Sequence, residues 1–386
     1  MKKTPSRLIP DGKSQRIKRA MKGMPEMSKR SFYVRESELD DFQRQVLNKK
    51  VDKSFIVKGC AGSGKSILAL WKAHDIVSNN RGSLQIIVFN KALKSYMEEA
   101  LRAIGINPSL VDYWHHWKNN PRRSDYIIVD EVQDFGQEAL EAFMNNARIA
   151  LLYGDSAQQL YGWRKEDAPL SVEEIAAATG LSTENLVFNH RLPKTIARFA
   201  QCICPEGDDL ENRCRNEGSE KPYVLKYDSY EEEMKGIASI IANRGFDDIG
   251  ILFPKNEDVD NAARFFSANG LKVEKKTSSD MDLNWSTTNP KLMTYHSAKG
   301  AQFEAVFIPE CTAGDRFRNA LYVATTRTYQ SLYITYTDYL SPLLSGIPGN
   351  LFNKSLSSST SDWFSGRGYA PVTDNSCNVY DEDIPF

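Results

Sequence analysis

The chain contains few cysteines and no long apolar run. Six cysteines in 386 residues are too few for the disulfide framework of a small secreted protein, and they fit a reducing compartment. No apolar run approaches the roughly 18 residues that a membrane span needs. The first 30 residues are basic but lack the apolar segment of a secretory signal. We therefore expect a cytoplasmic protein with no membrane partner.

The cysteines also give little support to a metal site. Cys202, Cys204 and Cys214 lie close together in the sequence but lack the paired C-x-x-C spacing of a zinc site. A metal site there is the less favoured alternative. A hydrophobic content of 41% and a charged content of 26% describe a globular chain, long enough for two or three domains.

The net charge of −1 hides a strong asymmetry. Residues 1–30 hold ten Lys and Arg against Asp11 and Glu26, a net charge of +8. We predict a flexible basic arm over residues 1–34. Such an arm suits a polyanion partner, and a solvated, disordered tail without a partner is the alternative that stays open.

A phosphate-binding loop follows the first strongly apolar stretch. The β-prone run that begins at Phe55 ends in a glycine-rich turn, and a helix-like stretch follows. Residues 59–66 carry the G-x-x-x-x-G-K-S pattern in the strand–loop–helix context that a phosphate loop requires. Its glycines let backbone N–H groups turn toward phosphate oxygens, while the lysine and the serine serve the outer phosphates and Mg²⁺. The residues predicted to bind ATP here are Gly59, Gly62, Ser63, Gly64, Lys65 and Ser66.

Strands and helices alternate along most of the chain, which predicts an α/β fold with parallel sheets. We predict strands from Phe55 and over 84–89, 125–130, 149–153, 223–227, 249–253, 292–295, 305–308 and 332–335. Helices are predicted over 39–47, 66–77, 91–104, 137–146, 195–202, 231–242 and 258–268. Ligands of such sheets bind at the carboxyl ends of the strands. The phosphate loop and two acidic segments, 130–131 and 155–158, fall at these ends.

Asp130 and Glu131 supply the second requirement of a nucleotide hydrolase. They follow a buried strand some 65 residues after the phosphate loop. We predict that Asp130 holds Mg²⁺ and that Glu131 orients and deprotonates the attacking water.

The chain resembles the superfamily 1A helicases, the UvrD/Rep/PcrA group, over roughly residues 35–338. The ordered motifs that carry the resemblance are Gly59–Ser66, Asp130–Asp134, Gly154–Arg164, Asn189–Arg191, Thr294–Phe303 and Tyr322–Arg327, with Gln43 upstream. The resemblance implies two RecA-like parallel-sheet domains, at 35–188 and 189–340, with the phosphate loop in the first. It implies an ATP-dependent single-stranded DNA translocase or 3′→5′ helicase.

Roles for individual residues follow from the same resemblance. Gln43 would hydrogen-bond adenine, and Gln158 would sense the γ-phosphate. Arg191 and Arg327 would reach the phosphates from the second domain as arginine fingers. The nucleic-acid track would include the base-stacking Tyr161 and Trp163 and the flanking residues Phe89, Asn90, His115, Arg164 and His296. Direct contact of the two histidines with nucleic acid and a purely structural role are both open.

Several positions depart from the family pattern. His190 stands where the family has a tyrosine that stacks on adenine, so base selectivity is expected to relax. Gln302 replaces a glutamate and offers the ribose an uncharged partner. Two gaps, 118–124 and the stretch from Arg191 to Thr294, leave no room for the family's two accessory subdomains. We therefore expect a bare two-domain motor.

The end of the chain carries a second, shorter resemblance. Residues 341–386 are predicted to form a disordered tail rich in Ser, Gly, Pro and Asn. Its last residues, Asp381, Glu382, Asp383, Ile384, Pro385 and Phe386, resemble the acidic tip of bacterial single-stranded DNA-binding protein. The resemblance implies binding to proteins that recognise that tip. A solvated acidic tail is the alternative.

Two further readings of the motor stay open. The motifs do not separate DNA from RNA, so an RNA-directed motor is one alternative. A nucleic-acid-gated ATPase switch that recruits partners through the tail is the other.

Overall fold

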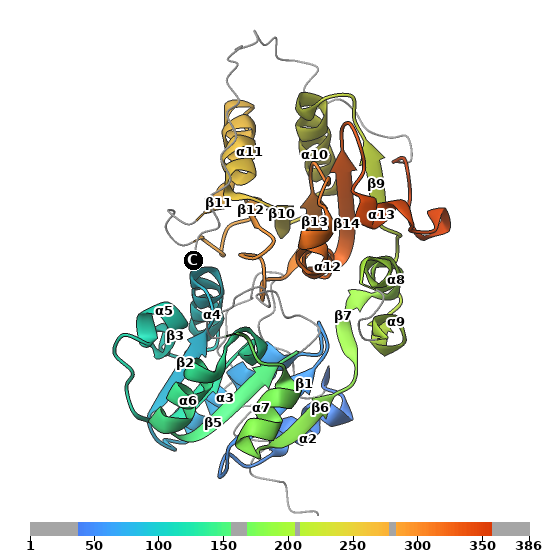
Figure 1. Ribbon diagram of the computed structural model, residues 1–386. Helices are drawn as coiled ribbons and strands as arrows, with labels where there is room; N and C mark the ends of the chain where they lie inside the picture. Colours follow the sequence, from blue (N-terminus) through green and yellow to red (C-terminus); the bar gives the residue numbers. More distant parts are fainter. Residues whose placement is uncertain (1–37, 156–167, 205–208, 278–282, 357–386) are drawn as a thin grey trace, which may run out of the picture. The chain divides into compact units, whose positions relative to one another are not determined.

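The computed structural model describes residues 38–155, 168–204, 209–277 and 283–356 (Figure 1). Several predicted features lie outside the described residues: the basic arm 1–34, Gln158, Tyr161, Trp163, Arg164 and the acidic tip 381–386. The described residues therefore include the two predicted parallel sheets and the predicted ATP-binding residues from Gln43 to Arg327 other than Gln158.

The first half of the chain forms a six-stranded sheet in the order β3-β2-β4-β5-β1-β6, with every neighbouring pair parallel. Its strands are β1 (Phe55–Gly59), β2 (Leu84–Val88), β3 (Val111–Tyr113), β4 (Ser124–Val129), β5 (Ala147–Gly154) and β6 (Ser182–Leu186). Its helices are α2 (Asp41–Asn48), α3 (Lys65–Ser78), α4 (Lys91–Ala103), α5 (Trp114–Trp117), α6 (Gln137–Asn146) and α7 (Val172–Thr179), with 3₁₀ turns η3 (Pro108–Leu110) and η4 (Val132–Asp134).

Both faces of this sheet are covered, as a parallel sheet requires. Alternate strand residues point to opposite faces, so Phe55 and Val57 pack with residues of α3 and α4 in one cluster. Ile56, between them, packs with Phe143 of α6 and Ile175 of α7 in another. The near-continuous apolar character of β1 and β2 follows from this burial on two sides.

The second half forms another six-stranded parallel sheet, in the order β11-β12-β10-β13-β14-β9. Its strands are β9 (Tyr223–Lys226), β10 (Ile249–Phe253), β11 (Glu274–Lys276), β12 (Lys291–Thr294), β13 (Phe303–Ile308) and β14 (Thr328–Tyr336). The helices of this half are α8 (Lys194–Ile203), α9 (Leu210–Arg213), α10 (Tyr230–Arg244), α11 (Asn256–Ala268), α12 (Arg318–Thr325) and α13 (Pro342–Ser345), with 3₁₀ turns η6 (Asp315–Phe317) and η7 (Gly349–Leu351). Strands β7 (Asn189–Pro193) and β8 (Cys214–Asn216) form a separate two-stranded parallel sheet.

The predicted α/β fold with two parallel sheets is confirmed, and every predicted strand and helix is present. Helix α6 and strand β10 have the predicted bounds. The first sheet ends with Leu186 and the second begins with Tyr223. The sheets therefore do not fix the boundary within this interval, and the predicted domain limits stay predictions. Helix α7 was missed, although its capping box, Ser171 with Glu174, is a recognisable start signal.

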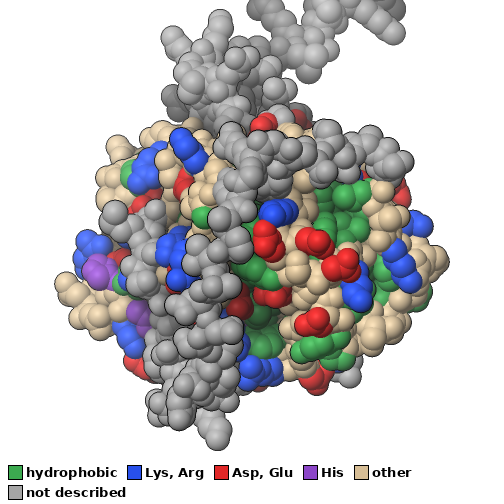
Figure 2. Space-filling model, turned by 90° about the horizontal axis from the view of Figure 1, so that it is seen from above, with side chains coloured by type: hydrophobic (Ala, Val, Ile, Leu, Met, Phe, Trp, Pro, Cys, Tyr) green, Lys and Arg blue, Asp and Glu red, His purple; other side chains and the backbone are tan. Residues whose placement is uncertain are grey.

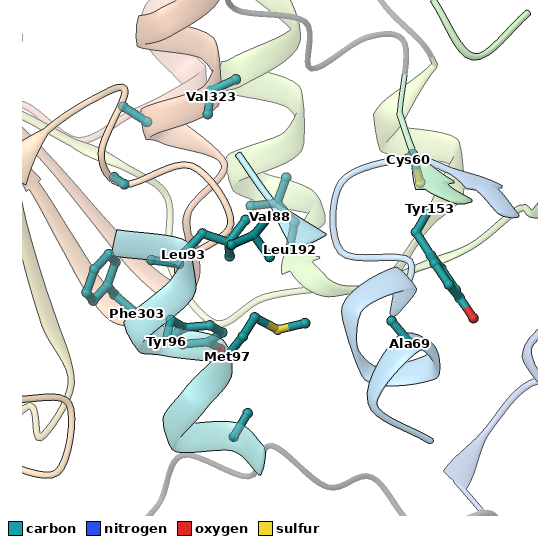
Figure 3. Packing of buried hydrophobic residues seen from close by; sticks show 14 of the residues in the cluster. Cys60, Ala69, Val88, Leu93, Tyr96, Met97, Tyr153, Leu192, Phe303 and Val323 are labelled. Atoms are coloured by element: carbon teal, nitrogen blue, oxygen red, sulfur yellow. The ribbon is translucent and has the colours of Figure 1, made fainter. Parts of the chain in front are cut away.

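The two halves share one apolar cluster. Figure 3 shows members of this cluster from both halves: Leu93, Tyr96 and Met97 on α4, with Phe303 and Val323 from the second half. Trp285, just before β12, is 5% exposed. Its indole N–H donates to Ser95 Oγ at 3.0 Å, and its ring meets Tyr96 edge-on at 5.3 Å. A side chain of the second sheet's loop is thereby anchored on α4.

The connections are short where accessory subdomains were expected to be missing. Residues 118–123 alone link α5 to β4. Between β10 and β12 the described residues hold α11, β11 and the segment that carries Trp285. None of the described helices is long and apolar enough to cross a membrane. On the face drawn in Figure 2, acidic and basic side chains are both present, so that face is not uniformly basic.

Candidate active site

The phosphate loop lies between β1 and α3, as the sequence predicts. Gly62 and Gly64 have φ values of +70° and +88°, in the left-handed region that favours glycine. A Cβ on Gly62 would lie 2.3 Å from Asn189 Oδ1. The N–H of His190 donates to the carbonyl of Gly62 at 3.1 Å. Residues at the start of β7 therefore pack directly on the loop.

Lys65 crosses its own loop. Its ammonium group donates to the carbonyls of Gly59 (2.9 Å) and Cys60 (3.1 Å) and lies 3.9 Å from Asp155 Oδ2. The side chains of Lys65 and Asp155 are both at least 93% buried. A positive charge is thereby held at the mouth of the glycine turn, where the outer phosphates of a nucleotide are expected.

Ser66 and Asp130 offer a pair of oxygen ligands. The hydroxyl of Ser66 donates to Asp130 Oδ2 at 2.6 Å, and Asp130 Oδ1 accepts from the N–H of Glu131 at 3.0 Å. Burial, and then the neighbouring charge of Glu131, raise the pKa of Asp130 to about 6. A divalent cation relieves this repulsion, and Mg²⁺ prefers such hard oxygen ligands. The residues present therefore fit Mg²⁺.

No group of three or more His, Cys, Asp or Glu suited to a metal occurs within the described ranges. Mg²⁺ held here would take its remaining ligands from phosphate and water, as it commonly does. The cysteines Cys202, Cys204 and Cys214, all described, do not form a metal site.

Glu131 is held in an unusual backbone conformation, with φ +55° and ψ +44°. Such strain in a non-glycine residue is characteristic of functional sites. Gln133 Nε2 donates to Glu131 Oε2 at 2.6 Å, and Gln133 Oε1 accepts from the N–H of Asp155 at 2.9 Å. This buried amide therefore fixes the carboxylate and ties it to the end of β5.

The surroundings of Glu131 favour its ionised form despite its burial. Burial raises its pKa, but Lys299, then Lys65, the Gln133 hydrogen bond and Arg327 together outweigh that effect, and the pKa lies below its usual value. Two of these cations, Lys299 and Arg327, come from the second half of the chain. The carboxylate that is predicted to activate water is thus controlled from both halves.

Lys299 makes a contact that the sequence analysis did not assign. Its ammonium group donates to Asp134 Oδ1 at 2.6 Å, and the two side chains are 2% and 1% exposed. The lysine lies between β12 and β13, and Asp134 ends the η4 turn that follows Glu131. Next to it, Gly300 (φ +84°) packs so closely on α4 that a Cβ would lie 2.5 Å from Leu93 Cδ1. The signal was present in the sequence as the lysine inside the Thr294–Phe303 motif.

Arg191 and Arg327 lie near each other. Arg191 Nη2 donates to the carbonyl of Thr326 at 2.9 Å, whereas its Nε is buried and has no hydrogen-bond partner. Burial of the guanidinium group, and then the charge of Arg327, lower the pKa of Arg191 to about 9. Arg327 is 2% exposed, and burial likewise lowers its pKa. A buried donor without a partner, beside a second cation, fits an anionic ligand.

The residues predicted to meet the base are already hydrogen-bonded. Gln43 Nε2 donates to the carbonyl of Ser63 at 3.0 Å, and Gln43 Oε1 accepts from the N–H of Asp40 at 3.0 Å. His190 Nε2 lies 2.6 Å from Asp40 Oδ2. Gln302 is half-buried. Their contacts with adenine and ribose stay predictions.

The predicted nucleic-acid residues that are described lie in the β2–α4 connection, on α5 and in the β12–β13 connection. Phe89 is 7% exposed and lies edge-on to Phe135 (5.4 Å) and His115 (6.0 Å). Asn90 caps α4, accepting from the N–H of Leu93 at 2.8 Å. Burial, and then the charge of Lys299, lower the pKa of His296. The structure brings Phe89 and His115 together, and contact of any of the four with nucleic acid stays a prediction.

The Lys299–Asp134 pair gives a prediction about stability. Lys299→Met or Asp134→Asn alone should lower the free energy of unfolding by about 3–5 kcal/mol, because each leaves a buried charge uncompensated. The double variant should lose clearly less than the sum. The exposed pair Lys235 and Glu231 is the control, with an expected coupling below about 1 kcal/mol. Denaturant unfolding measures all of these, and strict additivity at Lys299 and Asp134 would contradict the buried pair.

Two family models match the chain. Residues 55–237 match the viral superfamily 1 RNA helicase core domain, and residues 291–335 match the UvrD-like helicase C-terminal domain. No protein of curated function matches the chain significantly.

Three solved structures are similar to it at low identity. One is the C-terminal domain of a possible DNA helicase from Lactobacillus plantarum WCFS1, at 19% identity and a TM-score of 0.36, which covers 43% of this chain and 98% of that domain. Another is the arterivirus nonstructural protein 10 helicase, at 16% identity and a TM-score of 0.39, which covers 76% of this chain and 61% of its own. The third is the same arterivirus helicase in complex with DNA, at 17% identity and a TM-score of 0.41, which covers 75% of this chain and 62% of its own. This chain thus spans about three-fifths of the arterivirus helicase.

The matched residues 55–237 contain the phosphate loop, Asp130, Glu131 and Arg191, and are similar to the viral superfamily 1 RNA helicase core domain. The matched residues 291–335 contain Lys299 and Arg327, and are similar to the UvrD-like helicase C-terminal domain.

Proposed function

We propose that the chain is an ATP-driven motor on single-stranded DNA, a translocase or 3′→5′ helicase. One observation carries the proposal. Three cations from the second half, Lys299, Arg191 and Arg327, converge on the region of Glu131, and the buried Nε of Arg191 has no hydrogen-bond partner among the described residues. A transferred phosphoryl group is the anion whose charge such groups stabilise.

The first half supplies the nucleotide cradle. Lys65 and the N–H groups of the loop bind the phosphates, since the loop's glycines leave no Cβ between backbone and ligand. Ser66 and Asp130 would hold Mg²⁺, which neutralises phosphate charge when bound. Gln158, three residues beyond the described Asp155, is proposed to sense the γ-phosphate.

Glu131 acts as the base. Its lowered pKa keeps it ionised at neutral pH, and the Gln133 amide holds one carboxylate oxygen, leaving the other for water. Arg191 and Arg327 stabilise the charge that spreads over the phosphoryl oxygens in the transition state. Because these groups come from different halves, hydrolysis changes the interactions between the halves, and we propose that this change moves the strand.

A second candidate function is a nucleic-acid-gated ATPase switch. The short link 118–123, where relatives carry an accessory subdomain, favours it, because strand separation in the family is associated with the larger form. An RNA-directed motor is a variant of the first proposal. The match of residues 55–237 to the viral superfamily 1 RNA helicase core domain is the reason to test it.

The central experiment is ATP hydrolysis with single-stranded DNA, duplex DNA and RNA side by side. Single-stranded DNA should stimulate the rate most. Glu131→Gln should bind ATP with Mg²⁺ yet lose most turnover, because the water loses its base. Arg191→Ala and Arg327→Ala should each cut the rate about 10²–10⁴-fold.

Arg264→Ala is the matched control, because Arg264 lies on the outer helix α11 and contacts Asn261. It should retain the full rate. Normal turnover in Glu131→Gln, or in both site arginine variants, would refute the assigned site. If RNA stimulated ATP hydrolysis more than DNA did, RNA would be identified as the nucleic acid along which the motor moves.

Direction of movement is a separate prediction. A 3′→5′ motor should displace streptavidin from a biotinylated 5′ end and leave a 3′-end block in place. Without accessory subdomains, unwinding of a long duplex should be weak by comparison. Displacement from the 3′ end alone would reverse the polarity. DNA-stimulated hydrolysis with neither displacement nor unwinding would identify the switch.

We further propose that residues 381–386 bind proteins that recognise the tip of single-stranded DNA-binding protein. Phe386 offers an apolar ring beside the acidic Asp381, Glu382 and Asp383, so a small pocket with an Arg rim can hold both features. Phe386→Ala should abolish binding to such a partner and leave ATP hydrolysis intact. Fluorescence anisotropy of the tail peptide measures this, and equal binding without Phe386 would refute it.

A further inference from the structure

We infer that the site recognises a nucleoside triphosphate through its phosphates and not through its base, so that ATP, GTP, CTP and UTP are all accepted. The inference rests on the proposed nucleotide hydrolysis and concerns its substrate class. It follows from the hydrogen bonds of the residues that were predicted to read adenine.

Both ends of the Gln43 side-chain amide are already hydrogen-bonded within the protein. Reading adenine requires both ends of an amide, one to donate and one to accept. In Gln43 the Oε1 atom accepts from the N–H of Asp40, and one N–H of Nε2 donates to the carbonyl of Ser63, both at 3.0 Å. The side chain is 6% exposed. A base would have to compete with these bonds for an amide that is almost fully buried, so little selectivity should result.

The hydrogen bonds between Gln43 and the backbone fix the start of α2 and the position of the phosphate loop. Asp40 Oδ1 accepts from the N–H of Gln43 at 2.7 Å, which completes a capping box at the start of α2. At its other end, Gln43 Nε2 lies against the phosphate loop, where a Cβ on Gly64 would come within 2.7 Å of it. Gln43 thus braces the loop against α2.

Asp40 also holds His190, the residue that stands at the base-stacking position. Its Oδ2 lies 2.6 Å from His190 Nε2, while its Oδ1 accepts from Gln43. One carboxylate therefore fixes both residues that were expected to meet the base. The Nε2 atom of the imidazole is therefore engaged by Asp40, while the ring face can stack on a base.

The neighbouring side chains are mostly aromatic rings, with the guanidinium group of Arg215 lying over the Phe188 ring at 3.6 Å. Phe188 meets His190 edge-on at 6.4 Å and Phe42 edge-on at 5.7 Å. Phe42 is 37% exposed. Stacking on such rings tolerates every base, because every base has a π-face. The opposite end of the site differs sharply, since Lys65, Arg191 and Arg327 there are charged groups suited to phosphate.

Two measurements test the inference. The first is kcat/KM for ATP, GTP, CTP and UTP with the full chain and saturating single-stranded DNA. The second is displacement of a fluorescent nucleotide by each of the four from the Glu131→Gln variant, which does not depend on turnover. We expect all four values to agree within about fivefold in both measurements.

The Gln43→Ala variant shows whether Gln43 supports the phosphate loop or recognises adenine. If Gln43 braces the loop, kcat/KM should fall by a similar factor for all four nucleotides. If it reads adenine, only the ATP value should fall. Gln45→Ala is the matched control, on the same helix but bonded to Glu184 at the surface, and it should leave all four values unchanged.

The outcomes distinguish this inference from the proposed function. An ATP preference above about 20-fold that Gln43→Ala removes would overturn the inference and leave the proposed hydrolysis intact. Equal binding of all four without hydrolysis of any would support the inference and overturn the motor. Failure to bind any nucleotide would overturn both.

Discussion

Burial of charge between the two halves is the constraint on which the rest of the structure depends. Removing an ion from water costs several kcal/mol even after relaxation, unless an opposite charge or good hydrogen bonds offset it. Lys299 with Asp134, Lys65 with Asp155, and Glu131 among its cations meet this requirement through contacts at the ends of strands. Each of these groups lies just after a strand, in a short turn or at the start of a helix, where the backbone keeps opposite charges at such close distances.

Apolar contacts between the two halves help to hold these charged groups in position. The largest cluster contains side chains of both sheets, and Trp285 is anchored on α4 by a hydrogen bond and an aromatic contact. The segment that carries Trp285 lies where relatives are expected to hold an accessory subdomain. A short anchored segment therefore joins the halves in the described part of the chain.

The sequence predicted the fold well because a doubly covered parallel sheet leaves a strong pattern. Short apolar runs such as 84–89 cannot be half-exposed, and the glycines of 59–66 have no other common use. The phosphate-binding residues, Asp130 and Glu131 followed for the same reason. The sequence placed Lys299 and Asp134 in two separate motifs, but it could not pair them, because the two residues are 165 positions apart. The Asp40–Gln43 capping box is a recognisable sequence signal. The contact of Asp40 with His190, 150 positions away, could not be predicted, because it depends on tertiary packing.

The unpartnered Nε of Arg191 has a thermodynamic consequence. The folded chain holds two neighbouring guanidinium groups whose mutual repulsion and desolvation oppose folding, and the unfolded chain does not. An anion that binds them stabilises the folded state alone, by RT ln(1 + [L]/Kd) for free ligand concentration [L]. One arginine lies on β7 and the other between α12 and β14, so such an anion would contact two separate elements of the fold. The free energy of unfolding should therefore rise with the concentration of any anion that binds this pair.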